Sequence, residues 1–213
     1  MKQTKQSVFT NGKALTYTHI TNGADTICYM FSGSGYTYER PLLYYSTMLM
    51  LEKGYDVVHI HYGYEKGFLQ SDLSKISQVI TEDVRAVLLD VAKLHHYQSY
   101  LFLGKSLGTI PIAMHLMKAN DYLEAKMMLL TPLFSFDEVY QSVLKTNQST
   151  YIVIGDQDPH FDSAKIEALK VNNNIHVTTI NQANHALDIT PYDSLSSLDA
   201  LKTVISSLRL FLK

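Results

Sequence analysis

The sequence predicts an α/β fold with a mostly parallel central sheet, an N-terminal antiparallel hairpin and helices on both faces. Three observations carry this prediction. Strand and helix signals alternate along the chain, the inner strands read as continuous apolar runs, and short polar motifs follow directly after several of these runs. Continuous apolar strands are typical of a sheet covered on both faces, and the alternation implies right-handed crossovers between parallel strands.

The first predicted elements are mainly strands. Residues 8–20 read as a hairpin, because Asn11-Gly12 is a favoured two-residue turn in which both positions tolerate positive φ. Residues 26–31 form a continuous apolar run, as expected of a strand buried on both faces. A helix is expected over residues 41–53, and it should end there because a glycine follows directly. The next strand is expected over residues 55–61.

The rest of the chain alternates helices with short strands. Residues 71–97 carry apolar side chains at spacings of three and four, which is the period of one helix face. Residues 134–150 leave room for one short helix between two strands. The other predicted elements are strands over residues 100–103, 125–131, 151–154 and 174–180, and helices over residues 107–119 and 193–210.

Composition indicates a globular protein and excludes several classes. Of the 213 residues, 46% are hydrophobic and 18% are charged, whereas a disordered chain would be richer in charge. The formal net charge of −2 gives no large field that would attract nucleic acid. The single cysteine, Cys28, excludes an intramolecular disulfide. The length suits one α/β domain over residues 1–213.

We expect a cytoplasmic protein without a membrane or nucleic-acid partner. The first residues are polar, so no secretory leader is expected, and no run approaches the ~18 apolar residues of a membrane span. The sequence leaves open whether the protein forms a homodimer.

The segment Gly104-Lys105-Ser106-Leu107-Gly108 carries the most specific chemical signal. It lies between a short buried strand and a helical stretch, which is the context of a Gly-x-Ser-x-Gly nucleophile elbow. The glycines leave room in a sharp turn, and the start of the helix favours developing negative charge on the serine. The alternative is a tight turn with a capping serine. A phosphate-binding loop is rejected, because position 99 is Ser where that motif needs Gly.

A nucleophilic serine needs a general base and a carboxylate that orients the base. His185 follows the last predicted strand, and Asp158 and Asp156 follow the preceding one. Asp158 is preferred because it lies further into its loop, whereas an aspartate in the first turn, such as Asp156, commonly bonds its own backbone. His160 is a rival base because it is close to Asp158 in sequence. The order Ser106, Asp158, His185 is one of the known orders of a serine triad.

With these motifs, nearly the whole chain resembles the α/β-hydrolase superfamily, and specifically its small bacterial members without a lid domain. The resemblance rests on the elbow, on residues 155–158, on Asn184-His185 and on residues 31–36, where the family places its oxyanion loop. It implies that the backbone N–H groups of Ser34 and Leu107 bind the oxyanion, with Gly35 as an alternative donor. The loop has Ser32 where the family usually has His, which removes no backbone donor.

The resemblance also implies a serine hydrolase that acts on a small carboxylic ester or thioester through an acyl-enzyme, with no cofactor and no metal. A serine nucleophile disfavours dehalogenase, epoxide hydrolase and dienelactone hydrolase activity. Only residues 134–150 stand where many members insert a lid, so we expect a shallow, open site. The runner-up is a small-ligand-binding protein on the same fold, because fold alone does not establish catalysis.

Several other residues have two readings. Tyr36, Tyr38, Tyr62 and Tyr64 follow strands on the expected catalytic edge and either line a substrate groove or are ordinary surface tyrosines; Tyr36 and Tyr62, with Gly35, are the chosen substrate-binding candidates. His59 and His61 could suggest a metal pair, but a structural role is preferred because no further ligand pattern follows. Arg40 could hold a substrate carboxylate, although a surface role is preferred. Finally, Cys28 is expected in the core.

Overall fold

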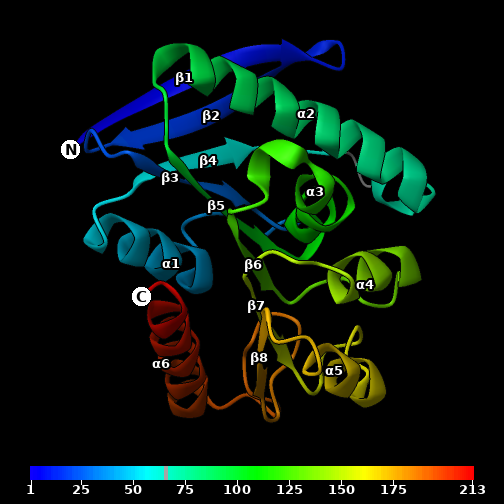
Figure 1. Ribbon diagram of the computed structural model, residues 1–213. Coiled ribbons are helices and arrows are strands. Elements are labelled where there is room, and N and C mark those ends of the chain that lie inside the picture. Colours follow the sequence, from blue (N-terminus) through cyan, green and yellow to red (C-terminus); the bar gives the residue numbers. More distant parts are fainter. Residues whose placement is uncertain (65–66) are drawn as a thin grey trace.

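The computed structural model describes residues 1–64 and 67–213 and forms an eight-stranded sheet (Figure 1). The strand order is β1-β2-β4-β3-β5-β6-β7-β8. Strand β2 pairs antiparallel with both β1 and β4, and all pairs from β4 to β8 are parallel, which confirms the predicted architecture. The strands are β1 Lys2–Thr10, β2 Lys13–Thr21, β3 Thr26–Phe31, β4 Asp56–His61, β5 Ser99–Lys105, β6 Lys126–Leu130, β7 Thr150–Gly155 and β8 Ile175–Ile180.

Helices cover both faces of the sheet. Figure 1 shows α1 and α6 on one face and α2, α3, α4 and α5 on the other. Each face has its own cluster of buried apolar side chains, and the inner strands contribute to both clusters. The helices are α1 Pro41–Glu52, α2 Leu73–Leu94, α3 Thr109–Met114, α4 Asp137–Leu144, α5 Ser163–Leu169 and α6 Ser194–Phe211. Within the described ranges, no helix is long and apolar enough to cross a membrane.

Three elements differ from the sequence-based prediction. The hairpin is longer than residues 8–20, because β1 is an edge strand whose polar N-terminal half carries no apolar pattern. The helix predicted over residues 107–119 is interrupted at His115, which has φ −133° and whose Nε2 lies 2.9 Å from Ser77 Oγ of α2. Helix α5 was not predicted, although Asp162 caps it by accepting hydrogen bonds from two backbone N–H groups, a signal that the sequence contains.

The parallel strands bring four loops to one edge of the sheet. These loops follow β3, β5, β7 and β8, and they carry Gly33–Tyr36, Ser106, Asp158 and His185. Ligands of such sheets bind at the carboxyl ends of the strands, so a site is expected at this edge.

Candidate active site

Ser106 lies in a sharp turn between β5 and α3. Its φ of +52° is in the left-handed region, which is strained for a residue with a side chain. The backbone approaches itself closely here: a methyl group on Gly104 would collide with the carbonyl of Gly108, and one on Gly108 would collide with the carbonyl of Phe31 in β3. Both positions therefore require glycine, and the turn holds Ser106 at the edge of the sheet.

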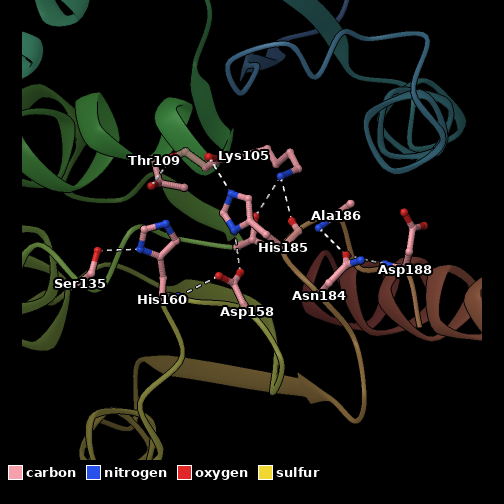
Figure 2. Close-up of polar contacts among 11 residues, drawn as sticks. Lys105, Thr109, Ser135, Asp158, His160, Asn184, His185, Ala186 and Asp188 are labelled. Atoms are coloured by element: carbon pink, nitrogen blue, oxygen red, sulfur yellow. Dashed lines mark hydrogen bonds and ion pairs between the residues drawn. The ribbon is translucent and has the colours of Figure 1, made fainter. Parts of the chain in front are cut away.

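Ser106, His185 and Asp158 form one hydrogen-bonded chain. Figure 2 shows the His185 ring and the Asp158 carboxylate pointing toward each other, joined by a dashed line. Ser106 Oγ lies 2.9 Å from His185 Nε2, and His185 Nδ1 lies 2.7 Å from Asp158 Oδ2. A carboxylate only accepts hydrogen bonds, so Nδ1 carries the proton in the neutral ring and Nε2 is left to accept from the serine hydroxyl. This arrangement can remove a proton from Ser106.

The two candidate carboxylates, Asp158 and Asp156, have different hydrogen-bond partners. Asp158 is 4% exposed, and its second oxygen, Oδ1, accepts the backbone N–H of His160 at 2.9 Å. Asp156 Oδ1 instead accepts the backbone N–H of Gln182 at 2.7 Å and the side-chain amide of Gln157 at 3.1 Å. Asp156 therefore joins the loop after β7 to the loop after β8, and it makes no hydrogen bond to His185 in the described residues.

Among the described residues, His160 makes no hydrogen bond to Ser106. Its Nδ1 lies 2.6 Å from Ser135 Oγ, and its ring meets the His185 ring edge-on at a centroid distance of 5.2 Å. Burial lowers the pKa of His160, which favours the neutral ring beside His185. His160 thus packs beside the hydrogen-bonded chain without joining it.

The loop that carries His185 is held by its own backbone and by β7. Asn184 Oδ1 accepts the backbone N–H groups of Ala186 at 2.8 Å and Asp188 at 3.2 Å, which closes a tight turn around His185. The carbonyl of Ala183 accepts the N–H of Gln157 at 3.0 Å. These contacts fix the turn relative to the end of β7.

Gly155 allows that close approach, because a methyl group there would collide with the carbonyl of Ala183. We expect Gly155→Ala to push the His185 loop outward and to reduce kcat/KM for a short ester by at least about tenfold, because small displacements of catalytic groups have large kinetic effects. Steady-state kinetics and a thermal melt measure the effect. Gly63→Ala is the control, since its added methyl meets nothing within 4 Å. Equal kinetics for the two variants would contradict this account.

The loop after β3 lies against the Ser106 turn. Residues 33–36 form a turn in which the Tyr36 N–H bonds the Gly33 carbonyl at 3.3 Å and Gly35 has φ +67°. A methyl group on Gly33 would lie only 3.3 Å from both the Lys105 carbonyl and Ser106 Cβ. Ser34 and Gly35 are thus the exposed central residues of a turn that lies against Ser106, and buried Leu107 follows Ser106 directly.

A cavity of about 830 Å³ opens beside Ser106, between the first turns of α1 and α6. Its volume is typical of small-molecule sites. No residue of α4 lines the cavity. The lining residues are Gly33, Ser34, Gly35, Tyr36, Arg40, Pro41, Leu42, Lys105, Ser106, Pro159, Asn184, His185, Ala186, Leu187, Asp188, Ser194, Ser197, Leu198 and Leu201.

Of the four tyrosines considered for a substrate groove, Tyr36 alone lines this cavity. Tyr38 is buried; its hydroxyl donates to the Met30 carbonyl at 2.6 Å, so it belongs to the core. Tyr62 packs against Tyr64, with ring centroids 5.4 Å apart, on the α2 side of the sheet. The Tyr64 hydroxyl donates to Asp83. Tyr62 and Tyr64 lie away from the cavity because residues that follow neighbouring strands can turn to opposite faces of the sheet.

His59 and His61 do not face a common metal. Their ring centroids are 6.4 Å apart, and each Nε2 bonds a threonine hydroxyl, at 2.8 Å to Thr47 and 2.7 Å to Thr18. Burial lowers the pKa of His59 to about 3, so this ring is neutral at physiological pH. Both histidines therefore have structural partners.

Within the described residues, the group with metal-ligand spacing is Asp158, His160 and His185, whose ligand atoms lie within 4.8 Å of one another. Two of these residues are already joined by the 2.7 Å hydrogen bond. A metal ion there would compete with that bond.

Lys105 belongs to the site although the sequence reasoning did not single it out. Only 2% of the residue is exposed, and its ammonium donates to Thr131 Oγ1 and to the His185 carbonyl, both at 3.1 Å (Figure 2). Burial lowers the pKa of Lys105 to about 8, although Asp158 and Asp188 raise it. The available signal was a long charged side chain at the end of a buried strand, where small or apolar residues are expected.

Comparisons with known proteins bear on the family and the fold. A sequence model described as alpha/beta hydrolase domain matches residues 26–213. Est1E from Butyrivibrio proteoclasticus has a similar structure, with a TM-score of 0.74 and 18% identity over 97% of each chain.

Two further solved structures are similar. A Pyrococcus furiosus esterase has a TM-score of 0.73 and 13% identity over 99% of this chain and 91% of that one. A serine hydrolase without a lid from Xanthomonas campestris has a TM-score of 0.72 and 11% identity over 99% of this chain and 94% of that one. At these identities the likeness shows the fold. No curated protein matches the chain in sequence.

Proposed function

Since the chain belongs to the alpha/beta hydrolase family, we propose that it is a serine hydrolase that cleaves a small carboxylic ester or thioester through an acyl-enzyme. The observation that carries the proposal is the hydrogen-bonded chain from Ser106 Oγ through His185 to Asp158, with distances of 2.9 and 2.7 Å. It supports nucleophilic catalysis because a serine hydroxyl at its ordinary pKa is a weak nucleophile and needs a base within hydrogen-bond reach.

Acylation begins when Ser106 Oγ attacks the substrate carbonyl carbon and its proton passes to His185 Nε2. Asp158 accepts from Nδ1 throughout, which stabilises the imidazolium that forms. The tetrahedral intermediate then collapses, the bond from carbon to the leaving oxygen or sulfur breaks, and Nε2–H protonates the leaving group. Deacylation repeats these steps with water as the nucleophile and releases the carboxylic acid and free Ser106.

The negative charge of the tetrahedral intermediate needs fixed donors. We assign this role to the backbone N–H groups of Ser34 and Leu107, with Gly35 as the alternative to Ser34. The support is the contact between the loop after β3 and the Ser106 turn, where a methyl group on Gly33 would lie 3.3 Å from Ser106 Cβ. One donor of this kind lowers the barrier by about 3 kcal/mol in a well-studied enzyme.

The length of the acyl chain gives a test of this function. The inner cavity wall has buried apolar side chains, Leu42 and Leu187, but the outer wall includes Leu198, which is 60% exposed. Each methylene buried against the inner wall contributes roughly 0.8 kcal/mol, and methylenes beyond it stay in water. We therefore expect kcat/KM to rise from acetyl to about butyryl or hexanoyl and then to flatten or fall.

The measurement uses p-nitrophenyl esters of graded length, below micelle-forming concentrations, with Ser106→Ala as the blank. A steady rise through dodecanoyl would contradict the short inner wall, while hydrolysis itself would still support the function. Wild-type rates equal to those of the Ser106→Ala blank for every ester would count against the function.

A further inference from the structure

Lys105 is a buried cation on the wall of the candidate substrate cavity. Two of its three N–H donors bond neutral oxygens, Thr131 Oγ1 and the His185 carbonyl, at 3.1 Å each. Its ammonium also lies 4.7 Å from the centroid of the Tyr36 ring, which lines the same cavity. Among the described residues these two oxygens are the acceptors of the ammonium, so its third N–H donor is not used by a hydrogen bond to them.

The charge of Lys105 has no close counter-charge in the described residues. No carboxylate there lies within the 4.0 Å of an ion pair with Lys105 Nζ. Asp158, which raises the pKa of Lys105 more than Asp188 does, is bonded to His185, and Asp188 is exposed on the cavity wall. Burying a cation without a paired anion is costly, and lysine is almost never fully buried unless paired. Such a group in a ligand cavity indicates that the ligand brings the negative charge.

A second cation lines the same cavity. Arg40 lines the cavity, and its guanidinium carbon is 5.9 Å from the centroid of the Tyr36 ring. Arg40 is exposed and has no ion pair among the described residues. Lys105 and Arg40 therefore both border the Tyr36 ring, one buried and one at the surface.

We propose that the cavity binds an ester whose non-reacting part carries a carboxylate, held by the ammonium of Lys105 and the guanidinium of Arg40 beside Tyr36. The inference rests on the proposed function and names its substrate class. The remaining wall has apolar side chains such as Leu42 and Leu187, so the substrate joins its carboxylate to the ester through a short apolar or aromatic body. Charge-assisted hydrogen bonds to a carboxylate are among the stronger polar contacts.

The first test measures binding without turnover. Ser106→Ala is titrated calorimetrically at pH 7 with 4-acetamidobenzoate and with the neutral isostere 4-acetamidobenzamide. We expect the acid to bind about tenfold or more tightly, the effect typical of one hydrogen bond to a charged group. Equal affinities, or no binding of the acid, would overturn the inference. This outcome is independent of whether the native protein hydrolyses esters.

Variants in the same background assign the preference to Lys105. Lys105→Met should abolish most of the acid preference, and Arg40→Met should reduce it a few-fold because Arg40 is exposed. Lys126→Met is the matched control: Lys126 also donates to a backbone carbonyl, that of Phe211, and lies 5.4 Å from its ring, but it does not line the cavity. An acid preference that survives Lys105→Met would mean that the carboxylate binds elsewhere, for example at the oxyanion donors, and would refute the assignment.

The opposite charge change should have the opposite effect. Asp188 faces the cavity and is exposed, so Asp188→Asn should raise the acid preference a few-fold by removing repulsion. The change leaves the Asp188 backbone N–H free to keep its bond to Asn184 Oδ1. A lower preference in this variant would contradict the inference.

The pH dependence has a definite sign. Lys105 holds its proton below its pKa of about 8 and loses it above, so the acid preference should fall as the pH rises from 7 to 9.5. The other charged or titratable groups near it are Asp158, Asp188, His160, His185, Tyr36 and Arg40. In Lys105→Met the residual preference should not change over this range. A wild-type preference that is constant from pH 7 to 9.5 would contradict a role for the ammonium.

The kinetic test separates this inference from the proposed function. Native protein is assayed with 4-acetoxybenzoate and with 4-acetoxybenzamide, and kcat/KM should favour the acid about tenfold. Hydrolysis of both esters at equal rates would overturn the inference and leave the function standing. Hydrolysis of neither, combined with selective binding of the acid by Ser106→Ala, would overturn the function and support a carboxylate-binding site.

Discussion

A fluorophosphonate probe should label the native protein on Ser106, and Ser106→Ala should remain unlabelled. The serine Oγ attacks the probe phosphorus and fluoride leaves. The hydroxyl proton passes to His185 Nε2, which lies 2.9 Å from Oγ. Labelling therefore reports an activated hydroxyl and not merely an exposed one. Heat denaturation should abolish labelling, because the activation depends on residues from loops 79 positions apart in the sequence.

Hydrolysis should fall in parallel with labelling. Removing the nucleophile of a serine triad costs on the order of 10⁶ in kcat in a well-studied protease, so Ser106→Ala should be at the assay background. Ser135→Ala is the matched control, since Ser135 also bonds a histidine, His160, at 2.6 Å but is outside the chain to Asp158. Labelling that persists in Ser106→Ala and disappears in Ser135→Ala would contradict the assignment. A folded native protein without labelling would favour a ligand-binding role on the same fold.

The fold could be predicted because its signals are local. Continuous apolar runs mark the inner strands, and the amphipathic period marks α2 and α6, so the parallel core followed from spacing alone. The edge strand β1 lacked such a signal in its polar first half, because an edge strand against one helix buries little. Helix α5 has only seven residues, which is too short for a periodic pattern to stand out.

For each site residue, the sequence could predict which strand end it follows but not the direction of its side chain. Parallel strands bring their following loops to one edge, which brought Ser106, Asp158 and His185 together. Which way a side chain turns at that edge depends on packing: Tyr38 turned into the core and Tyr36 into the cavity, two residues apart in one loop. The partners of Lys105 come from the residue that follows β6 and from the loop after β8, and no local pattern records such contacts.

The choice between the two carboxylates can be tested by Asp158→Asn, which should leave the fold intact and reduce kcat by up to about 10⁴, the effect of the same change in the best-studied triad. The geometry explains why. Asp158 Oδ1 accepts the His160 N–H, and an asparagine must keep an oxygen there. Its NH₂ group then faces His185 Nδ1, where it can only donate. Nδ1 becomes the acceptor, Nε2 carries the hydrogen, and the ring has no lone pair for the proton of Ser106.

Asp156→Asn is the matched variant, with the same chemical change two residues away. Asparagine keeps an oxygen for the Gln182 N–H, which Asp156 Oδ1 now accepts at 2.7 Å, but loses the charge that strengthens this bond. We expect a loss of about 1 kcal/mol of stability and a kcat within a few-fold of the native value. Steady-state kinetics and denaturant titration of both variants decide the matter. If Asp156→Asn loses the activity while Asp158→Asn loses only stability, the acid is Asp156, and the 2.7 Å contact between Asp158 and His185 would be structural.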